Sequence, residues 1–169
     1  MLEDLNSKRL SSTGVGRVRP PAPARGVLNP LRPLRFLVAD DNDGDVHWLR
    51  MVLDQTGAYC TLSVVTDGEQ ARDFLLRRGG YANAPEQDLI FLDLNLPKLT
   101  GIEVLRQIPG SARMPLCIIT GSDAERELLN REFGIRRIAY IVKPVDRMKL
   151  LNCFRCYDHL RPLADTLST

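Results

Sequence analysis

Short apolar runs alternate with amphipathic stretches along most of the 169-residue chain. The apolar runs have the length of β-strands and are rich in Val, Ile, Leu and Phe. Five strands are expected: Arg35–Ala39, Tyr59–Val65, Asp88–Leu92, Pro115–Ile119 and Ile138–Val142. Because continuous apolar runs are typical of strands that are buried on both faces, the pattern predicts a parallel sheet between two layers of helices.

The stretches between the apolar runs repeat with the period of an α-helix. Five helices are expected, over residues 45–57, 66–78, 100–108, 122–133 and 145–160. Asp45 is a candidate N-cap of the first helix, and Thr66 and Ser122 begin capping-box patterns for the second and fourth. Gly134 is expected to stop the fourth helix and Pro162 to follow the fifth. Five β-α units in order indicate an α/β fold.

Residues 1–33 show neither period and differ in composition from the rest. They hold five of the eleven prolines and carry a net charge of +4, which leaves −2 for the remaining chain. We expect a flexible basic Pro/Arg-rich leader over 1–33, one domain over 34–160 and a short C-terminal tail over 161–169. The basic pI is therefore a property of the leader and does not favour nucleic-acid binding by the domain.

Targeting and cysteine patterns are also informative. The longest apolar runs are far shorter than the ~18 residues of a membrane span, and the N-terminus lacks the apolar region of a secretory signal. We therefore expect a cytoplasmic protein with reduced cysteines. Cys60 and Cys117 lie in expected strands and should be in the core, and the pair Cys153 and Cys156 lacks the second pair of a zinc site.

Polar residues follow four of the five expected strands. Asp40 and Asp41 follow the first, Asp93 the third, Thr120 the fourth and Lys143 the fifth. The carboxyl ends of parallel strands meet at one edge of the sheet, where ligands bind. The pattern thus predicts three carboxylates, one hydroxyl and one ammonium at a single edge.

These groups suit phosphoryl chemistry. Three close carboxylates repel one another unless a cation joins them, and hard oxygen ligands favour Mg²⁺. Mg²⁺ and a lysine would together neutralise an incoming phosphoryl group, and a carboxylate can act as the nucleophile that forms an aspartyl phosphate. We predict Mg²⁺-dependent phosphorylation of one aspartate.

The same residues resemble a known family. Asp40-Asp41, Asp93, Thr120 and Lys143-Pro144, each at the end of an apolar run, look like the CheY-like receiver domain of two-component response regulators. The segment Leu92–Gly101 is similar to the family's phosphoacceptor segment. The resemblance covers roughly residues 34–160. It implies a flavodoxin-like, doubly wound sheet of five parallel strands in the order 2-1-3-4-5 with five helices.

The resemblance also implies a role for each residue at the sheet edge. Asp93 would be the phosphoacceptor in a phosphorelay, and Lys143 would pair with the phosphoryl group. Asp40, Asp41, Asp93 and the backbone carbonyl of Asn95 would hold Mg²⁺. The domain would be a signalling module with self-catalysed phosphorylation and dephosphorylation, and not an enzyme.

Two further residues would report the phosphorylated state. The resemblance implies that Thr120 is the switch hydroxyl and Tyr140 the switch aromatic, and that the Lys143–Pro144 peptide bond is cis. A sensor histidine kinase would be the donor. A narrower likeness points to small regulators paired with bacterial phytochromes and related kinases, and it rests on three segments: Asp41–Val46, Asp93–Pro97 and Tyr140–Asp146.

The output is expected to be a protein contact. Only nine residues follow position 160, so no DNA-binding domain is expected after it. The face formed by the fourth helix, fifth strand and fifth helix is the expected contact surface, and it could also pair two copies of the chain.

Two alternatives remain from the residues alone. Asp41 and Asp43 fit the D-x-D-G motif of haloacid-dehalogenase-like phosphatases, with Asp41 as nucleophile, although no acidic pair follows Lys143 and the Asp93 segment is left unexplained. An EF-hand loop is excluded because Val46 and Val52 replace its Gly and Glu. A scaffold that binds partners without phosphorylation is the other alternative.

Overall fold

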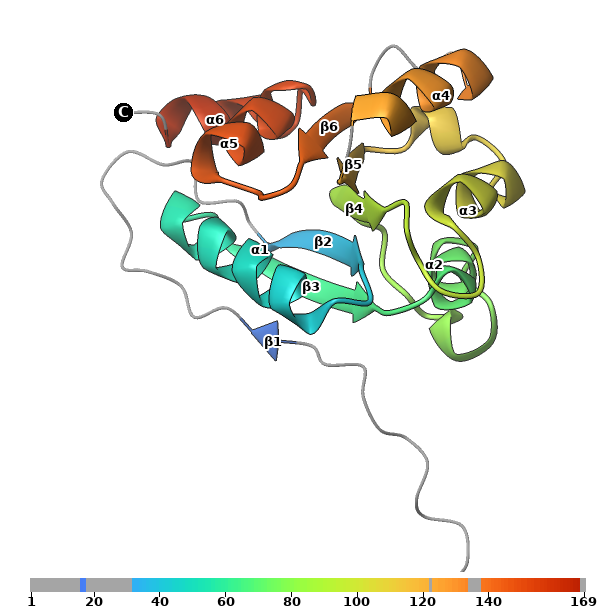
Figure 1. Cartoon of the computed structure of the whole chain (residues 1–169). Helices are drawn as coiled ribbons and strands as arrows, with labels where there is room; N and C mark the ends of the chain where they lie inside the picture. Colours follow the sequence, from blue (N-terminus) through green and yellow to red (C-terminus); the bar gives the residue numbers. More distant parts are fainter. Residues whose placement is uncertain (1–15, 18–31, 122, 134–137, 168–169) are drawn as a thin grey trace, which may run out of the picture.

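The computed structural model describes residues 16–17, 32–121, 123–133 and 138–167 (Figure 1). Five strands form a parallel sheet in the order β3-β2-β4-β5-β6, which is the predicted order 2-1-3-4-5. Their bounds are Leu34–Ala39 (β2), Cys60–Val65 (β3), Leu89–Asp93 (β4), Leu116–Thr120 (β5) and Ala139–Val142 (β6). All residues of β4 and β5 are buried, as continuous apolar runs predict.

Within the described residues six helices cover the sheet, one more than expected. They are α1 (Asp43–Thr56), α2 (Gly68–Leu75), α3 (Gly101–Gln107), α4 (Asp123–Phe133), α5 (Arg147–Arg155) and α6 (Arg161–Thr166), with short 3₁₀ turns at Gly79–Tyr81 and Ser111–Arg113. α1, α5 and α6 share one apolar cluster with one side of the sheet. α2, α3 and α4 share the other, so the sheet lies between two hydrophobic cores.

Three expected helix starts were wrong by one or two residues; one of them is that of α5, which begins at Arg147 after its N-cap Asp146 and not at Val145. α1 begins at Asp43, because the side chain of Asn42 accepts hydrogen bonds from the first-turn amides and makes Asn42, not Asp45, the N-cap. α2 begins at Gly68, because the extended residue Asp67, not Thr66, caps it. In each case the nearest short polar side chain in extended backbone takes the cap. The expected capping box at Ser122 and the stop at Gly134 lie outside the described residues.

The expected C-terminal helix ends early, at Arg155, and residues Arg161–Thr166 of the expected tail form a further helix, α6. Pro162 lies in the first turn of α6, where its missing N–H removes no intrahelical bond, so it begins a helix where we expected it to follow one. Leu160 and Ala164 are fully buried, and Leu163 and Leu167 pack against the same cluster. α6 therefore completes the core beside α5.

The expected leader is also attached at two described points. Gly16–Arg17 forms β1, which pairs antiparallel with β3 at the edge of the sheet. The Arg32 guanidinium donates two hydrogen bonds to the Asp88 carboxylate, at 2.7 and 2.8 Å. These contacts join two parts of the leader to the domain, and its other residues, 1–15 and 18–31, lie outside the described part.

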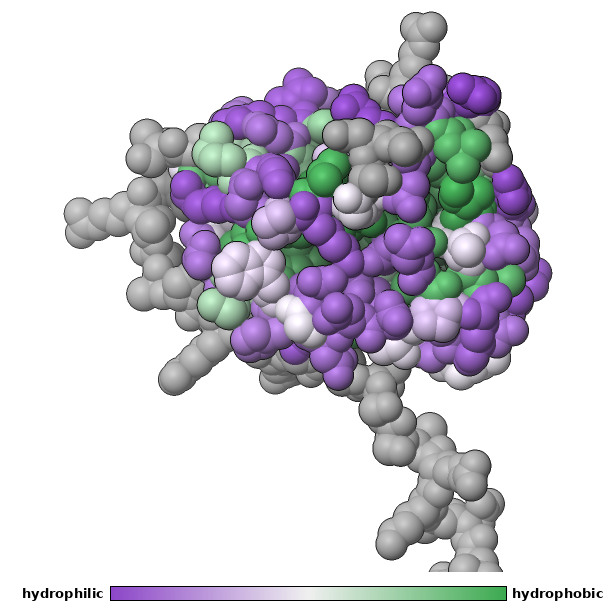
Figure 2. All heavy atoms as spheres, viewed as in Figure 1, coloured by the Kyte–Doolittle hydropathy of each residue, from purple (hydrophilic) through white to green (hydrophobic). Residues whose placement is uncertain are grey.

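The structure also shows the polarity of the surface and the state of the four cysteines. The face in Figure 2 is mainly hydrophilic, with hydrophobic residues exposed in separate patches. Cys60 and Cys117 are buried as predicted, Cys153 is buried and Cys156 is exposed, and all four are free thiols. In the part of the chain that the structure describes, no helix is both long and apolar enough to cross a membrane.

The backbone at the start of α2 lies very close to the loop after β4, and this contact leads to a stability prediction. A Cβ atom on Gly68 would lie 1.9 Å from the carbonyl oxygen of Leu99, so Gly68→Ala must displace backbone. We expect a loss of about 2–3 kcal/mol in the free energy of unfolding, measured by urea denaturation. Gly80→Ala is the matched control, because no heavy atom lies within 4 Å of a Cβ there. Equal stability of the two variants would contradict this prediction.

Candidate functional site

The polar residues predicted at the strand ends lie together at the carboxyl edge of the sheet. Asp40 directly follows β2, Asp93 and Thr120 end β4 and β5, and Lys143 directly follows β6. Asp40 and Asp93 are only 4% and 6% exposed, and Thr120 is fully buried. The parallel arrangement therefore brings residues up to 103 positions apart in the chain within hydrogen-bond distance.

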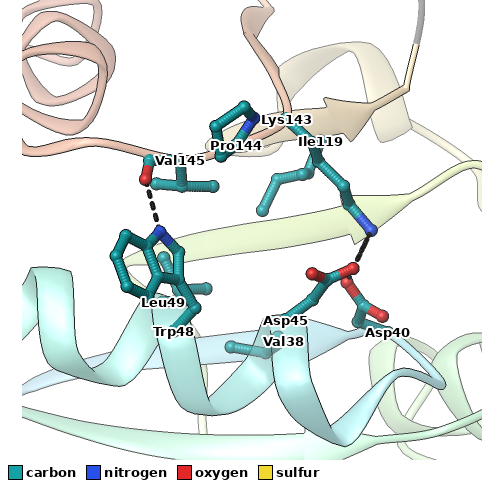
Figure 3. Close-up of a pocket in the computed structure, with 9 residues that line it drawn as sticks. All are labelled: Val38, Asp40, Asp45, Trp48, Leu49, Ile119, Lys143, Pro144 and Val145. Atoms are coloured by element: carbon teal, nitrogen blue, oxygen red, sulfur yellow. Dashed lines mark hydrogen bonds and ion pairs between the residues drawn. The ribbon is translucent and has the colours of Figure 1, made fainter.

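Lys143 is the centre of this arrangement. Its ammonium donates to one carboxylate oxygen each of Asp93, Asp45 and Asp40, at 2.5, 2.8 and 3.1 Å (the pairs with Asp45 and Asp40 are in view in Figure 3). Partial burial would lower the pKa of Lys143, but the hydrogen bonds to Asp45 and Asp93 outweigh it and raise the pKa well above the usual 10.5. Lys143 is thus a fixed positive charge among three negative ones.

Asp45 is the member of the site that sequence reasoning missed. We expected Asp45 to cap the first helix, but it lies inside the first turn of α1 and contacts Lys143. The sequence carried no signal for this role, because it depends on how α1 packs beside the loop that bears Lys143. Its carboxylate is 42% exposed, so it is the most solvated of the three that hold Lys143.

The buried carboxylate of Asp40 is poorly compensated. Burial raises its pKa above the usual 3.8, the nearby charge of Asp93 acts in the same direction, and hydrogen bonds from the Asn42 amide and Lys143 only partly offset this. A carboxylate held in this state gains from an additional cation. The site therefore has both the hard oxygen ligands and the excess negative charge that suit a divalent metal ion.

In the described structure the expected metal ligands do not surround a common point. Among the described residues, no group of three or more His, Cys, Asp or Glu side chains is placed to hold a metal ion. Lys143 contacts two of the carboxylates, and Asp41 and Asn95 are exposed at the rim. The Asn95 amide donates to Asp93 at 2.8 Å, which places the Asn95 backbone beside the expected phosphoacceptor.

Thr120 and Tyr140, the expected switch residues, both contact α4. The Thr120 hydroxyl donates to the carboxylate of Glu125. The Tyr140 hydroxyl donates to Asn130 at 3.4 Å, and the Arg126 guanidinium lies 5.4 Å from the centre of the Tyr140 ring. Burial raises the pKa of Tyr140. The Lys143–Pro144 peptide bond, which directly follows β6, is cis as the resemblance implied.

A cavity of about 250 Å³ adjoins the charged cluster. Asp40, Asp45 and Lys143 form its polar part, and six other residues line the rest: Val38, Trp48, Leu49, Ile119, Pro144 and Val145. Figure 3 shows the Trp48 indole reaching from α1 to the loop after β6, where its N–H donates to the Val145 carbonyl at 2.7 Å. Trp48 therefore holds α1 against the loop that carries Lys143.

The loop after Asp93 is anchored by a second ion pair. Lys98, whose backbone has a positive φ of 65°, donates to the buried Asp67 carboxylate at 2.7 Å. The Gly68 amide donates to the Pro97 carbonyl at 3.0 Å. The start of α2 thus holds the loop that bears Asn95.

This ion pair predicts a pH dependence. Burial favours protonated Asp67, but hydrogen bonds from Lys98 and Gln70 outweigh it and lower the pKa below the usual 3.8. Because the pKa is lower in the folded state, the carboxylate stabilises the fold above the ordinary aspartate pKa, and this contribution is lost as the pH falls below it. We expect the difference in unfolding free energy between the wild type and Asp67→Asn to shrink below pH 3.8. Lys98→Met should weaken this pH dependence. If the difference in unfolding free energy between the wild type and Asp67→Asn is the same above and below pH 3.8, the prediction is wrong.

Comparison with known proteins identifies the family. Residues 36–155 match the family model of the response regulator receiver domain. The response regulator Rcp1 of Synechocystis sp. is 36% identical over 100 residues, which cover 57% of this chain and 68% of Rcp1. The structure of the bacteriophytochrome response regulator AtBRR superimposes with a TM-score of 0.65 at 28% identity, covering 74% of this chain and 92% of AtBRR.

Two related structures carry chemical information. The phosphorylated cyanobacterial phytochrome response regulator RcpA has a TM-score of 0.57 at 27% identity, covering 80% of this chain and 89% of RcpA. The Mn²⁺-bound form of Rcp1 has a TM-score of 0.57 at 29% identity, with the same coverage. Receiver domains therefore bind a divalent metal.

The comparisons confirm the resemblance that the strand-end residues indicated, including the likeness to regulators of phytochromes. They do not favour the haloacid-dehalogenase-like alternative. A receiver domain implies a histidine kinase as its partner. The match covers the five parallel strands, apart from the first two residues of β2, and the site at their edge. The chain therefore belongs to the response regulator receiver family, the phosphoacceptor signalling domains of two-component systems, which are not enzymes in the ordinary sense.

Proposed function

We propose that Asp93 accepts a phosphoryl group from the phosphohistidine of a sensor histidine kinase and that the phosphorylated domain signals by protein contact. The observation that carries this proposal is the Lys143 ammonium, which lies 2.5 Å from the Asp93 carboxylate and is held there by Asp40 and Asp45. A cation fixed beside one buried carboxylate is suited to the charge of a transferring phosphoryl group.

The transfer balances without a further reactant. A carboxylate oxygen of Asp93 forms a bond to phosphorus while the P–N bond to the kinase histidine breaks; the electron pair of that bond goes to the nitrogen, and the ring, which already carries a proton on its other nitrogen, leaves as neutral imidazole. Lys143 neutralises charge on the phosphoryl oxygens, and the Thr120 hydroxyl can donate to one of them. The same groups would support self-catalysed phosphorylation by small donors and hydrolysis of the acyl phosphate.

We assign a Mg²⁺ site to the same edge. Asp40, Asp41 and Asp93 with the backbone carbonyl of Asn95 would hold the ion, which when bound supplies positive charge beside the phosphoryl oxygens. The raised pKa of Asp40 supports this assignment, because the buried carboxylate lacks sufficient positive charge around it.

Mg²⁺ binding should stabilise the folded domain. At about 100 times its Kd we expect a gain of about 2.7 kcal/mol and a rise in Tm of about 5–10 °C, measured by thermal unfolding with and without chelator. Asp41→Asn should lose most of this rise. Asp43→Asn is the matched control, because Asp43 is an equally exposed carboxylate two residues away and outside the proposed ligand set. A rise that Asp41→Asn leaves intact would contradict the ligand assignment.

We further propose a cytoplasmic regulator whose kinase is of the phytochrome type. Support comes from its similarity to AtBRR and RcpA, whose names associate them with bacteriophytochrome and cyanobacterial phytochrome. We also propose that the face formed by α4, β6 and α5 is the contact surface for the target or for a second copy of the chain. Leu128 of α4, which is 41% exposed, supports this choice.

The test is phosphorylation with acetyl phosphate and Mg²⁺, followed by mass spectrometry of the intact chain and of its peptides. We expect a gain of one phosphoryl group, located on Asp93 and absent when the metal is chelated. Steady release of phosphate with a label on Asp41 would indicate the phosphatase alternative. No mass gain, with partner binding that is indifferent to Mg²⁺, would indicate a scaffold, and either result would overturn the proposal.

A further inference from the structure

Helix α4 holds both residues of the expected switch. Glu125 accepts the hydrogen bond of the Thr120 hydroxyl, Arg126 lies over the Tyr140 ring, and Asn130 accepts from the Tyr140 hydroxyl. The three α4 side chains belong to a continuous helix, so a shift of α4 would affect both switch residues together. The contact with Thr120 is the one that bears directly on the phosphorylation site.

Thr120 can serve only one strong acceptor at a time. A threonine hydroxyl has a single proton to donate, and Thr120 is fully buried, so water does not compete for it. In this structure it donates to the carboxylate of Glu125, and hydrogen bonds to charged acceptors are stronger than those to neutral ones. A phosphoryl oxygen on Asp93 would need the same proton, so the phosphoryl group and Glu125 are alternative acceptors.

We propose that Glu125 is a positioning residue that retains the Thr120 hydroxyl at α4 and thereby opposes the phosphorylated state. This inference rests on the proposed phosphorylation of Asp93 and adds to it the residue that sets the threshold of the switch. Phosphorylation must displace Glu125 from Thr120, and the freed α4 then also changes its contacts with Tyr140. The effect is a shift of population between two arrangements of the same fold.

The sign of the effect can be measured with beryllofluoride, a stable mimic of the phosphoryl group, in the presence of Mg²⁺. Trp48 is the single tryptophan of the chain and lines the cavity beside Lys143, so its fluorescence can report binding. Glu125→Ala removes the competing acceptor, and we expect it to bind beryllofluoride about tenfold more tightly than the wild type. Glu125→Gln, which keeps an acceptor oxygen but no charge, should give a smaller gain.

Glu127→Ala is the matched control. Glu127 lies on the same helix, is 81% exposed and pairs with Arg131, so its removal takes the same charge from α4 without touching Thr120. We expect this variant to bind as the wild type does. A gain that equals that of Glu125→Ala would overturn the proposal, because the effect would then come from charge or helix stability.

A double-mutant cycle with Thr120→Ala tests the route of the effect. If Glu125 acts through the Thr120 hydroxyl, Glu125→Ala should have no effect on beryllofluoride affinity in the Thr120→Ala background. An undiminished gain in that background would overturn the proposal. If the wild type and Glu125→Ala bind beryllofluoride with equal affinity, the proposal that Glu125 retains the Thr120 hydroxyl is wrong, and the proposed function stands. If neither binds and neither is phosphorylated, the proposed function fails and this inference fails with it.

Discussion

Asp93→Asn is expected to abolish the gain of a phosphoryl group from acetyl phosphate or from a kinase. The carboxamide oxygen is a poor nucleophile, so the acyl phosphate cannot form, whereas it can still accept one of the two hydrogen bonds that Lys143 and the backbone amide of Asn95 donate to separate oxygens of Asp93. The variant should therefore fold and fail only in the chemistry. Intact-mass measurement after incubation with donor and Mg²⁺ gives the result directly.

Asp43→Asn provides the comparison for this experiment. It makes the same chemical change on an exposed carboxylate of α1, and it should be phosphorylated as the wild type is. Circular dichroism of both variants establishes that they are folded. If Asp93→Asn still gains a phosphoryl group, the acceptor is another residue, and peptide mapping would then test Asp41 first.

The parts of the fold that could be predicted depend on local patterns. β4 and β5 are apolar up to their last residue because both of their faces are covered, and this pattern is visible in the sequence. The place of Asp93 and Lys143 followed from one further step, since the carboxyl ends of parallel strands meet at one edge. Strand order, by contrast, came from the family resemblance, because an apolar run does not specify its neighbours.

The parts that could not be predicted depend on contacts between distant residues. Asp45 meets Lys143 across 98 positions, and its role as an ion-pair partner depends on how α1 packs beside β6. α6 was missed because Pro162 can either follow a helix or begin one, and the packing of Leu163 and Ala164 against the core decides which. Glu125 belongs to the capping-box pattern expected at Ser122, but that pattern does not predict its contact with Thr120, which depends on the position of Thr120 at the end of β5.

Lys143→Met is expected to have the second large effect, and on two properties at once. The rate of phosphorylation should fall by a factor of about 10²–10³, because a fixed charge that stabilises the transferring phosphoryl group is lost. Without Mg²⁺ the variant should also be less stable than the wild type by about 1–3 kcal/mol, because Asp40, Asp45 and Asp93 lose their shared hydrogen-bond donor. Single-turnover labelling measures the first effect and urea denaturation the second.

The response to Mg²⁺ separates the role of Lys143 as a counter-charge from a role in packing alone. Once the ammonium is absent, the carboxylates have more uncompensated charge, so added Mg²⁺ should raise the Tm of Lys143→Met more than that of the wild type. Lys149→Met serves as the matched control. Lys149 donates its hydrogen bonds to the Val142 and Pro144 carbonyls and lies outside the group of carboxylates that Lys143 contacts. Its phosphorylation rate and its Mg²⁺ response should equal those of the wild type. If Lys143→Met responds to Mg²⁺ no more than Lys149→Met does, the ammonium does not balance the acidic cluster, and the electrostatic account of this site is wrong.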